Sequence, residues 1–171
     1  MTAQAVSRAD VKQVWDWLDS VPDPEIPVIS VVDLGIVRDV AWVDDACVIT
    51  ITPTYSGCPA MTVIREDIER TLLARGIDRV RVQTRLAPAW TTDWMTPRGK
   101  DNLRGYGIAP PAQQVIDISG IGRKASQAPV LVCPHCGSRH TRLVSQFGST
   151  ACKALYRCGD CKELFDYFKA H

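Results

Sequence analysis

Two cysteine pairs near the carboxyl end of the chain constrain its fold more than any other feature. They are Cys133-Pro-His-Cys136 and Cys158-Gly-Asp-Cys161, and 21 residues separate them. Each Cys-x-x-Cys turn holds two thiolates at a suitable spacing for one ion, and a hairpin between two such turns brings all four sulfurs together. Residues 130–171 are therefore predicted to form a small all-β zinc ribbon. Its predicted metal ligands are Cys133, Cys136, Cys158 and Cys161.

Zinc is the expected ion, because a closed four-thiolate site is the usual structural zinc site and metal binding contributes folding energy to a small domain. The same thiolates also suit iron or an iron–sulfur cluster, and spacing does not distinguish them. Cys152 is a fifth thiol nearby. It has three interpretations: a core residue, a redox partner or a substitute ligand. His135 lies inside a knuckle and is expected to be exposed rather than coordinating.

The length of 171 residues is enough for one ordinary domain and a small one. No window approaches the roughly 18 apolar residues of a membrane span, and no basic-then-apolar signal opens the chain. We therefore expect a cytoplasmic protein with no membrane partner. In that reducing compartment, seven cysteines indicate metal ligation or thiol chemistry rather than disulfides. The net charge of +1 gives no general attraction to nucleic acid.

A strand-turn-helix pattern covers residues 48–61. The β-branched residues 48–52 predict a strand, Pro53 stops it, and Pro59 suits the first position of a helix. Cys58 is thus predicted at a helix N-terminus, where unpaired N–H groups and the helix dipole lower a thiol pKa and favour a reactive thiolate. The alternative is a small buried residue packed beneath the turn.

Hydrophobic periodicity predicts the other elements of the amino-terminal part. Together they give the order α-β-β-α-β-α, which predicts an α+β domain with a small three-stranded sheet and helices. Residues 1–111 are assigned to this domain and residues 112–129 to a linker. The predicted elements are a helix capped by Ser7 and ending by Val21, a hairpin of 36–43 and 46–52, a helix from Met61 to a cap at Gly76, a strand at 77–86 and a helix between Pro97 and Gly105.

Three carboxylates stand out near the start of this domain. Asp23 and Glu25 lie between prolines on a stiff loop, and the simplest interpretation is a solvated loop with two ordinary acids. Asp33 interrupts an apolar run, and it needs a partner because burying a lone carboxylate is costly. It either caps a turn or a helix, or it lines a site.

Three motifs in combination carry a family resemblance. Asp23-Pro-Glu-Ile-Pro27, Asp33-Leu-Gly35 and Thr54-Tyr-Ser-Gly-Cys-Pro59 together resemble the signature of SufT-like iron–sulfur cluster assembly factors, the MIP family. With residues 90–111 and the terminal module at 133–168, nearly the whole chain resembles the PaaD (PaaJ) family, the D component of bacterial phenylacetyl-CoA epoxidase (ring 1,2-monooxygenase) systems.

The resemblance implies a cytoplasmic accessory component of phenylacetate degradation that assists iron–sulfur or metal maturation. It implies that Cys58 is a reactive thiolate or cluster ligand, and that Asp23, Glu25 and Asp33 line its pocket. The implied cofactors are structural zinc and a transient iron–sulfur cluster. The implied partners are the other components of the epoxidase system, above all its iron–sulfur reductase.

The chain itself is not expected to activate oxygen or transfer hydride. None of its three histidines follows a Glu by three positions, as a di-iron carboxylate site requires, and it has no convincing dinucleotide fingerprint. Three functions stay open: a maturation factor that uses Cys58, a structural subunit of the oxygenase, and a zinc-ribbon nucleic-acid binder. Only the mildly basic tail, with six Lys/Arg against three Asp/Glu in residues 130–171, favours the last.

Overall fold

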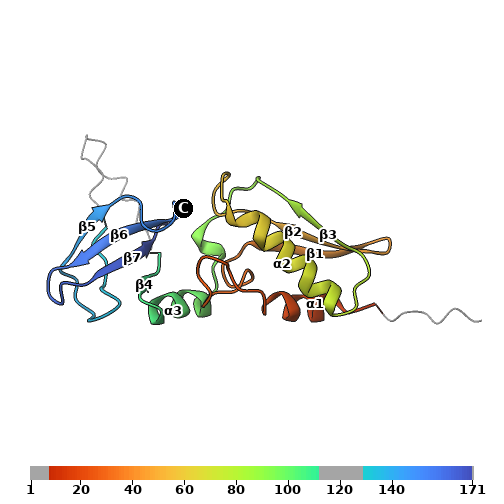
Figure 1. Ribbon diagram of the computed structural model, residues 1–171, viewed down its shortest axis with the longest axis horizontal. Coiled ribbons are helices and arrows are strands. Elements are labelled where there is room, and N and C mark those ends of the chain that lie inside the picture. Colours follow the sequence, from red (N-terminus) through yellow and green to blue (C-terminus); the bar gives the residue numbers. More distant parts are fainter. Residues whose placement is uncertain (1–7, 112–128, 171) are drawn as a thin grey trace, which may run out of the picture. The chain divides into compact units, whose positions relative to one another are not determined.

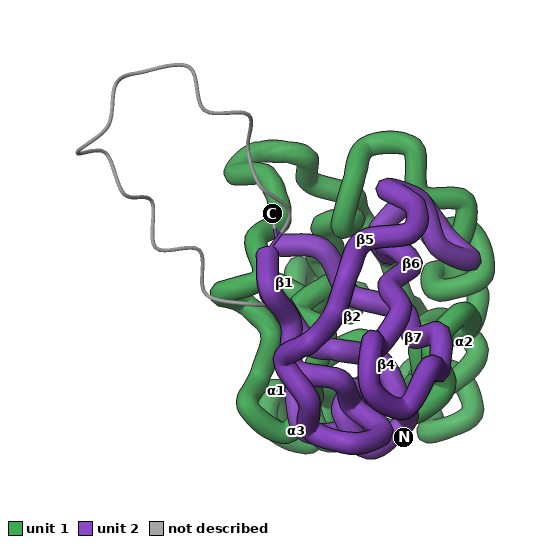
Figure 2. The backbone as a smooth tube through the Cα atoms, turned by 90° about the vertical axis from the view of Figure 1, so that its left-hand side faces the viewer, with its two compact units in different colours: residues 1–99 green, residues 100–171 purple. Residues whose placement is uncertain are grey.

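The computed structural model describes residues 8–111 and 129–170 (Figure 1). The chain divides into two compact units, residues 1–99 and 100–171 (Figure 2). The expected domain boundaries at 111/112 and 129/130 remain a prediction, because most of the expected linker lies outside the described residues. The expected helix cap Ser7 also lies outside them.

Unit 1 is built on a three-stranded sheet in the order β1-β2-β3. β1 (Val37–Val43) and β2 (Ala46–Ile51) form the predicted antiparallel hairpin. Asp44 turns the chain with a φ of 54°, a left-handed conformation that Asp tolerates better than most residues. β3 (Val80–Thr84) runs parallel to β2, so the connection between them must cross over.

Two helices pack around this sheet. α2 (Ala60–Ala74) is the crossover between β2 and β3, and its fully buried residues Ile64, Ile68 and Leu72 are the predicted apolar stripe. α1 (Val11–Leu18) packs against α2 and β1 (Figure 1). The described elements of unit 1 thus confirm the predicted α+β class.

Local details differ from the sequence prediction at two positions. Pro59 is the N-cap of α2 rather than its first helical residue. The strand predicted at 77–86 is shorter in the structure, and Leu86 lies beyond its end and is exposed. β3 is an edge strand of the described sheet and ends at Thr84. Alternation alone therefore overestimated its length.

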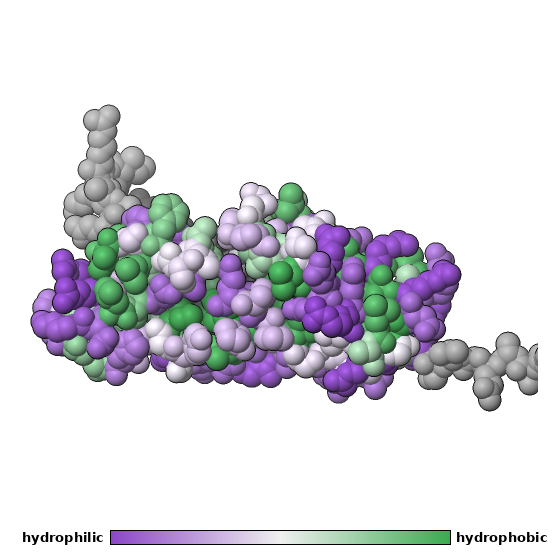
Figure 3. All heavy atoms as spheres, viewed as in Figure 1, coloured by the Kyte–Doolittle hydropathy of each residue, from purple (hydrophilic) through white to green (hydrophobic). Residues whose placement is uncertain are grey.

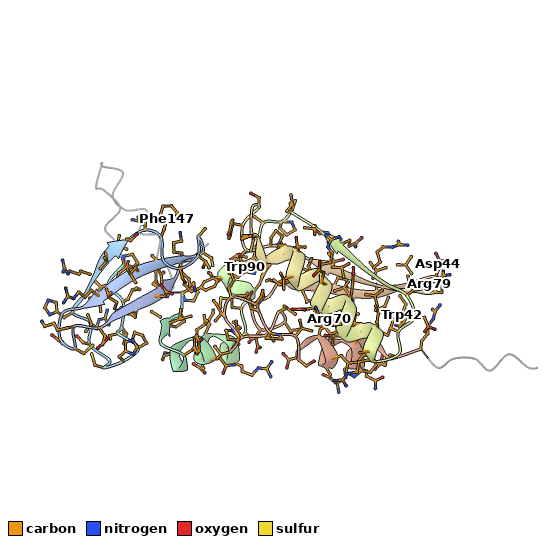
Figure 4. The ribbon with its side chains drawn as sticks, in the orientation of Figure 1. Trp42, Asp44, Arg70, Arg79, Trp90 and Phe147 are labelled. Atoms are coloured by element: carbon orange, nitrogen blue, oxygen red, sulfur yellow. The ribbon has the colours of Figure 1, made fainter. Side chains whose placement is uncertain are left out.

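The segment after β3 contains a short 3-10 helix, η1 (Thr92–Trp94), and α3 (Pro97–Gly105). The Thr96 hydroxyl accepts the Gly99 N–H at 3.0 Å, which is the N-cap bond expected for a Thr-Pro helix start. Trp90 is buried and its Nε1–H donates to the Leu34 carbonyl at 3.0 Å (Figure 4). Trp90 is therefore a packing residue of unit 1.

Unit 2 contains a four-stranded sheet in the order β4-β7-β6-β5. Tyr156 stacks on Phe165 and contacts Tyr167 edge-on within its core. β4 pairs in parallel with β7 and was not predicted, since a two-residue strand has no periodicity of its own. The strands are β4 (Ile108–Ala109), β5 (Thr141–Ser145), β6 (Lys153–Cys158) and β7 (Leu164–Phe168).

Within the part of the chain that the structure describes, no helix has the length and apolar character needed to cross a membrane.

Candidate functional site

Cys58 lies where the turn after β2 leads into α2, as the sequence predicts. Its N–H donates to the Tyr55 carbonyl at 3.1 Å, which closes the turn. Its thiol accepts a hydrogen bond from the Ala60 N–H and bonds with the Thr54 hydroxyl. The side chain is partly buried, so the sulfur is neither enclosed in the core nor fully solvated.

The acidic loop is folded tightly rather than solvated. Asp23 is only 5% exposed, and its Oδ1 accepts the N–H groups of Glu25 at 2.9 Å and Ile26 at 2.8 Å. The Asp23 N–H donates to the Ile29 carbonyl at 2.9 Å, so both ends of the loop are tied together. The interpretation of a solvated loop is therefore wrong for Asp23, whose carboxylate organises the loop and leaves Glu25 half-buried.

The fold brings this loop close enough to Cys58 for its charges to act on the sulfur. Burial raises the pKa of the Cys58 thiol, and the carboxylates of Glu25 and Asp23 raise it further. The Ala60 N–H and the Thr54 hydroxyl lower the pKa but do not outweigh these effects. The predicted thiolate with a lowered pKa is therefore wrong for the metal-free protein, because partial burial and two nearby anions oppose the helix N-terminus.

Asp33, the third predicted pocket carboxylate, bonds to the start of α3. Its side chain accepts hydrogen bonds from the Thr96 hydroxyl at 2.5 Å and the Arg98 Nε–H at 2.8 Å. Arg98 also binds Asp19 at 2.5 Å, and its pKa is raised by its hydrogen bonds to Asp33 and Asp19. The sequence alone does not pair Asp33 with Thr96 or Arg98, because more than 60 residues separate the partners.

This arrangement predicts a mainly structural effect of removing the Asp33 carboxylate. Asp33→Ala is expected to lower the free energy of unfolding by about 2 kcal/mol, because it removes a buried carboxylate that accepts hydrogen bonds from the half-buried Thr96 hydroxyl and from exposed Arg98. Urea unfolding followed by helical circular dichroism measures the change. The matched control is Asp39→Ala on β1, which is exposed and should stay within about 0.5 kcal/mol of the parent protein. A loss below about 1 kcal/mol for Asp33→Ala would contradict the anchoring role.

The four predicted metal ligands of unit 2 converge. Their sulfurs all lie within 4.8 Å of one another, and the Cys133–Cys161 and Cys136–Cys158 pairs are 3.7 and 3.6 Å apart. A tetrahedron with zinc–sulfur bonds of about 2.3 Å has edges of about 3.8 Å. The geometry therefore fits a four-thiolate metal site, as the sequence predicted.

The four neighbouring thiols also affect one another's ionisation. Burial opposes ionisation of Cys158, but the Cys161 and Asp160 N–H groups and the neighbouring thiols lower its pKa to about 6. For Cys161 the Glu163 N–H lowers the pKa, whereas burial and the other thiols raise it to about 12. Four sulfurs this close cannot all ionise together unless a positive ion lies among them.

Cys152 and His135 are not part of this group. Cys152 is buried just before β6, and its Sγ lies 3.0 Å from the Thr150 hydroxyl. Cys158 ends the same strand, so roughly 20 Å of extended chain separates the two residues. The substitute-ligand interpretation of Cys152 is therefore wrong, and its burial favours the core-residue interpretation. His135 is exposed, as expected.

Comparison with known proteins gives a family match for each of the two parts of the chain. Residues 11–83 match the family described as iron–sulfur cluster assembly protein, and residues 120–169 match the PaaD zinc beta ribbon domain. The Fe–S protein maturation auxiliary factor of Porphyromonas gingivalis is 36% identical over 81 residues, which are 46% of this chain and 76% of that protein. A crystal structure of a domain of unknown function, DUF59, from Bacillus anthracis has a TM-score of 0.50 and 29% identity, covering 54% of this chain and 90% of its own.

One relative extends over nearly the whole chain. The putative D component of the 1,2-phenylacetyl-CoA epoxidase of Escherichia coli K12 is 49% identical over 164 residues, which cover 96% of this chain and 95% of the relative. The resemblance of nearly the whole chain to PaaD proteins is thereby confirmed. The chain belongs to the PaaD family, the D components of 1,2-phenylacetyl-CoA epoxidase, and it combines a domain of the iron–sulfur cluster assembly family with a PaaD zinc ribbon.

Proposed function

We propose that this protein is an accessory component of a phenylacetyl-CoA epoxidase system and that it delivers iron, as an ion or within a cluster, to another component. The delivered metal is cargo, and Cys58 is its sulfur ligand. The observation that carries the proposal is the grouping of one thiol and two carboxylates, from chain segments about thirty residues apart, at the N-terminus of α2.

The charges around Cys58 suit a ligand that must bind and release a cation. Without metal the raised pKa keeps the thiol protonated, and the carboxylates of Asp23 and Glu25 give the site a negative potential. An entering iron ion displaces the thiol proton, since the metal ligand is the thiolate. Reprotonation of the sulfur weakens the bond again, which favours transfer of the metal to a client with more ligands.

The ribbon has a different part in this proposal. The bound ion, which we take to be zinc, stabilises the fold of unit 2, and the ribbon presents a surface to the client. The iron–sulfur reductase is the proposed client, because it is the component whose cluster has to be assembled. Relatives of the amino-terminal domain described as Fe–S protein maturation auxiliary factors support a role in maturation.

Iron binding by the zinc-loaded full chain tests the role of the carboxylates. The double variant Asp23→Asn/Glu25→Gln keeps an oxygen acceptor at position 23 for the loop N–H groups but removes both charges. In an anaerobic titration, this variant is expected to bind ferrous ion at least about tenfold more weakly than the parent. Mutation of residues that support a metal ligand usually lowers metal affinity by this much. The circular dichroism spectrum of the variant should match that of the parent.

The matched control removes two exposed carboxylates elsewhere in unit 1. Asp39→Asn/Glu66→Gln carries the same change in charge, and its iron affinity should stay within about twofold of the parent value. Equal affinities of the two double variants would exclude a built iron site at Cys58. The remaining candidate would then be a structural subunit of the epoxidase, which the name of the Escherichia coli relative favours.

A further inference from the structure

A basic hollow lies on the ribbon beside the metal knuckles, and no sequence motif points to it. It has a volume of about 380 Å³ and lies where β5 begins and β6 ends. We call it the basic pocket. The corresponding end of unit 2 is strongly hydrophilic on the face seen in Figure 3. The pocket is lined by His140, Thr141, Arg142, Arg157, Cys158, Gly159 and Lys162.

Two arginines face each other across this pocket. Arg142 on β5 and Arg157 on β6 are direct partners in the antiparallel register, and both are exposed. Like charges directly opposite one another destabilise a sheet. An anion between the two guanidinium groups would remove this repulsion and accept hydrogen bonds from both.

The described neighbours do not supply this anion. The Asp160 carboxylate is occupied by the Ser138 hydroxyl at 2.5 Å and by His140 Nδ1 at 3.2 Å. Among residues 8–111 and 129–170, Arg142 forms no ion pair. Arg157 uses its Nε–H on the Lys162 carbonyl at 3.3 Å, which orients the guanidinium and leaves its terminal N–H groups available.

We propose that the basic pocket binds the phosphate monoester group of a small ligand. A monoester is a dianion above its second pKa of about 6, so one group balances the charges of both Arg142 and Arg157. Its three terminal oxygens accept the paired N–H groups of two guanidinium forks at once. A carboxylate has one charge and two oxygens, and it satisfies one of the forks.

A nucleic acid fits the pocket less well. Each backbone phosphodiester has a single charge, and binding along a strand requires a continuous basic stripe with aromatic side chains for stacking. The described residues that line the pocket include no Trp, Tyr or Phe. The net charge of the whole chain is +1. A compact dianion is therefore the better match.

The test uses the ¹⁵N-labelled, zinc-loaded full chain at pH 7.5 and compares three probes: inorganic phosphate, adenosine 5′-monophosphate and adenosine 3′,5′-cyclic monophosphate. The first two contain a dianionic phosphate, whereas the cyclic diester has one charge on the same nucleoside. Phosphate and the monoester are expected to shift the amide signals of residues 140–142 and 157–162. The cyclic diester should bind at least about tenfold more weakly.

Arginine variants locate the binding site. Arg142→Gln and Arg157→Gln should each weaken monoester binding roughly 10- to 100-fold, the usual effect of losing charged hydrogen bonds. Arg139→Gln is the matched control, because Arg139 is exposed on the same ribbon but does not line the pocket. Its affinity should remain within about twofold of the parent value. Elemental analysis should give one zinc per chain in all three variants.

Several results would overturn the proposal. Equal binding of the monoester and the cyclic diester would mean that the nucleoside is recognised instead of the dianion. Tighter, strongly salt-dependent binding of a DNA duplex would identify a nucleic-acid surface. Loss of zinc from the Arg142 and Arg157 variants, without phosphate binding by the parent, would show that the arginines only balance the charge of the metal thiolates.

Discussion

Replacing Cys58 with Ser is expected to abolish metal delivery while the fold and the ribbon metal remain. A Ser hydroxyl does not ionise near neutral pH and is a poor ligand for iron and cluster iron compared with a thiolate. Cys58 is partly buried at the start of α2, and Ser is close to Cys in size, so the fold should tolerate the change. In cells without the native gene, the variant should lower the cluster content of the purified reductase at least about tenfold.

Iron and acid-labile sulfide per mole of reductase measure this effect, and growth on phenylacetate provides a second readout. Ser56→Ala is the matched control, since Ser56 is an exposed residue of the same turn. It should support the parent level of cluster assembly. Full cluster content with the Cys58 variant, together with one-to-one recovery of the protein with the oxygenase, would identify a structural subunit instead.

Replacing Cys158 with Ser is expected to release the ribbon metal and unfold the sheet of unit 2. Cys158 is fully buried and its sulfur lies within 4.8 Å of the other three, so its loss leaves an incomplete set of three thiol ligands. Structural zinc contributes about 10–16 kcal/mol of apparent binding energy in small domains, which is comparable to the whole stability of a typical domain. Removing zinc from the parent protein with a strong chelator should have the same result.

Elemental analysis measures the loss of the metal, and near-ultraviolet circular dichroism measures the loss of the fold. The second method is suitable because Tyr156, Phe165 and Tyr167 form the aromatic core of the ribbon. Protease cleavage should then become rapid in residues 129–170, whereas residues 8–99 should stay protected. Cys152→Ser is the control, and it should keep one zinc per chain because Cys152 lies outside the four-sulfur group. A stoichiometric metal in the Cys158 variant would contradict the assignment of this ligand.

The amino-acid sequence predicted those features that depend on neighbours within a few positions. Cys-x-x-Cys spacing identified all four ribbon ligands, since each pair shares one turn. The stripe of Ile64, Ile68 and Leu72 predicted the buried face of α2 from helical geometry alone. Cys58 was placed at the start of α2 by the strand, the turn residues and Pro59 that surround it.

The charge state of Cys58 needed the tertiary structure. Local reasoning had only the helix N-terminus, which lowers a thiol pKa. The opposing influences are burial and two carboxylates from a distant loop, and these determine the direction of the shift. The same limit applies to the partners of Asp33, because Thr96 and Arg98 lie more than 60 residues further along the chain.

By itself, the sequence determined the chemical groups that the protein carries: four thiols spaced for a metal, one thiol before a helix and an acidic loop between prolines. Only the tertiary structure decided which of these groups meet, from the loop beside Cys58 to the register that sets Arg142 against Arg157. The physical reason is that electrostatic and hydrogen-bond energies depend on separation in space, whereas sequence patterns report separation along the chain.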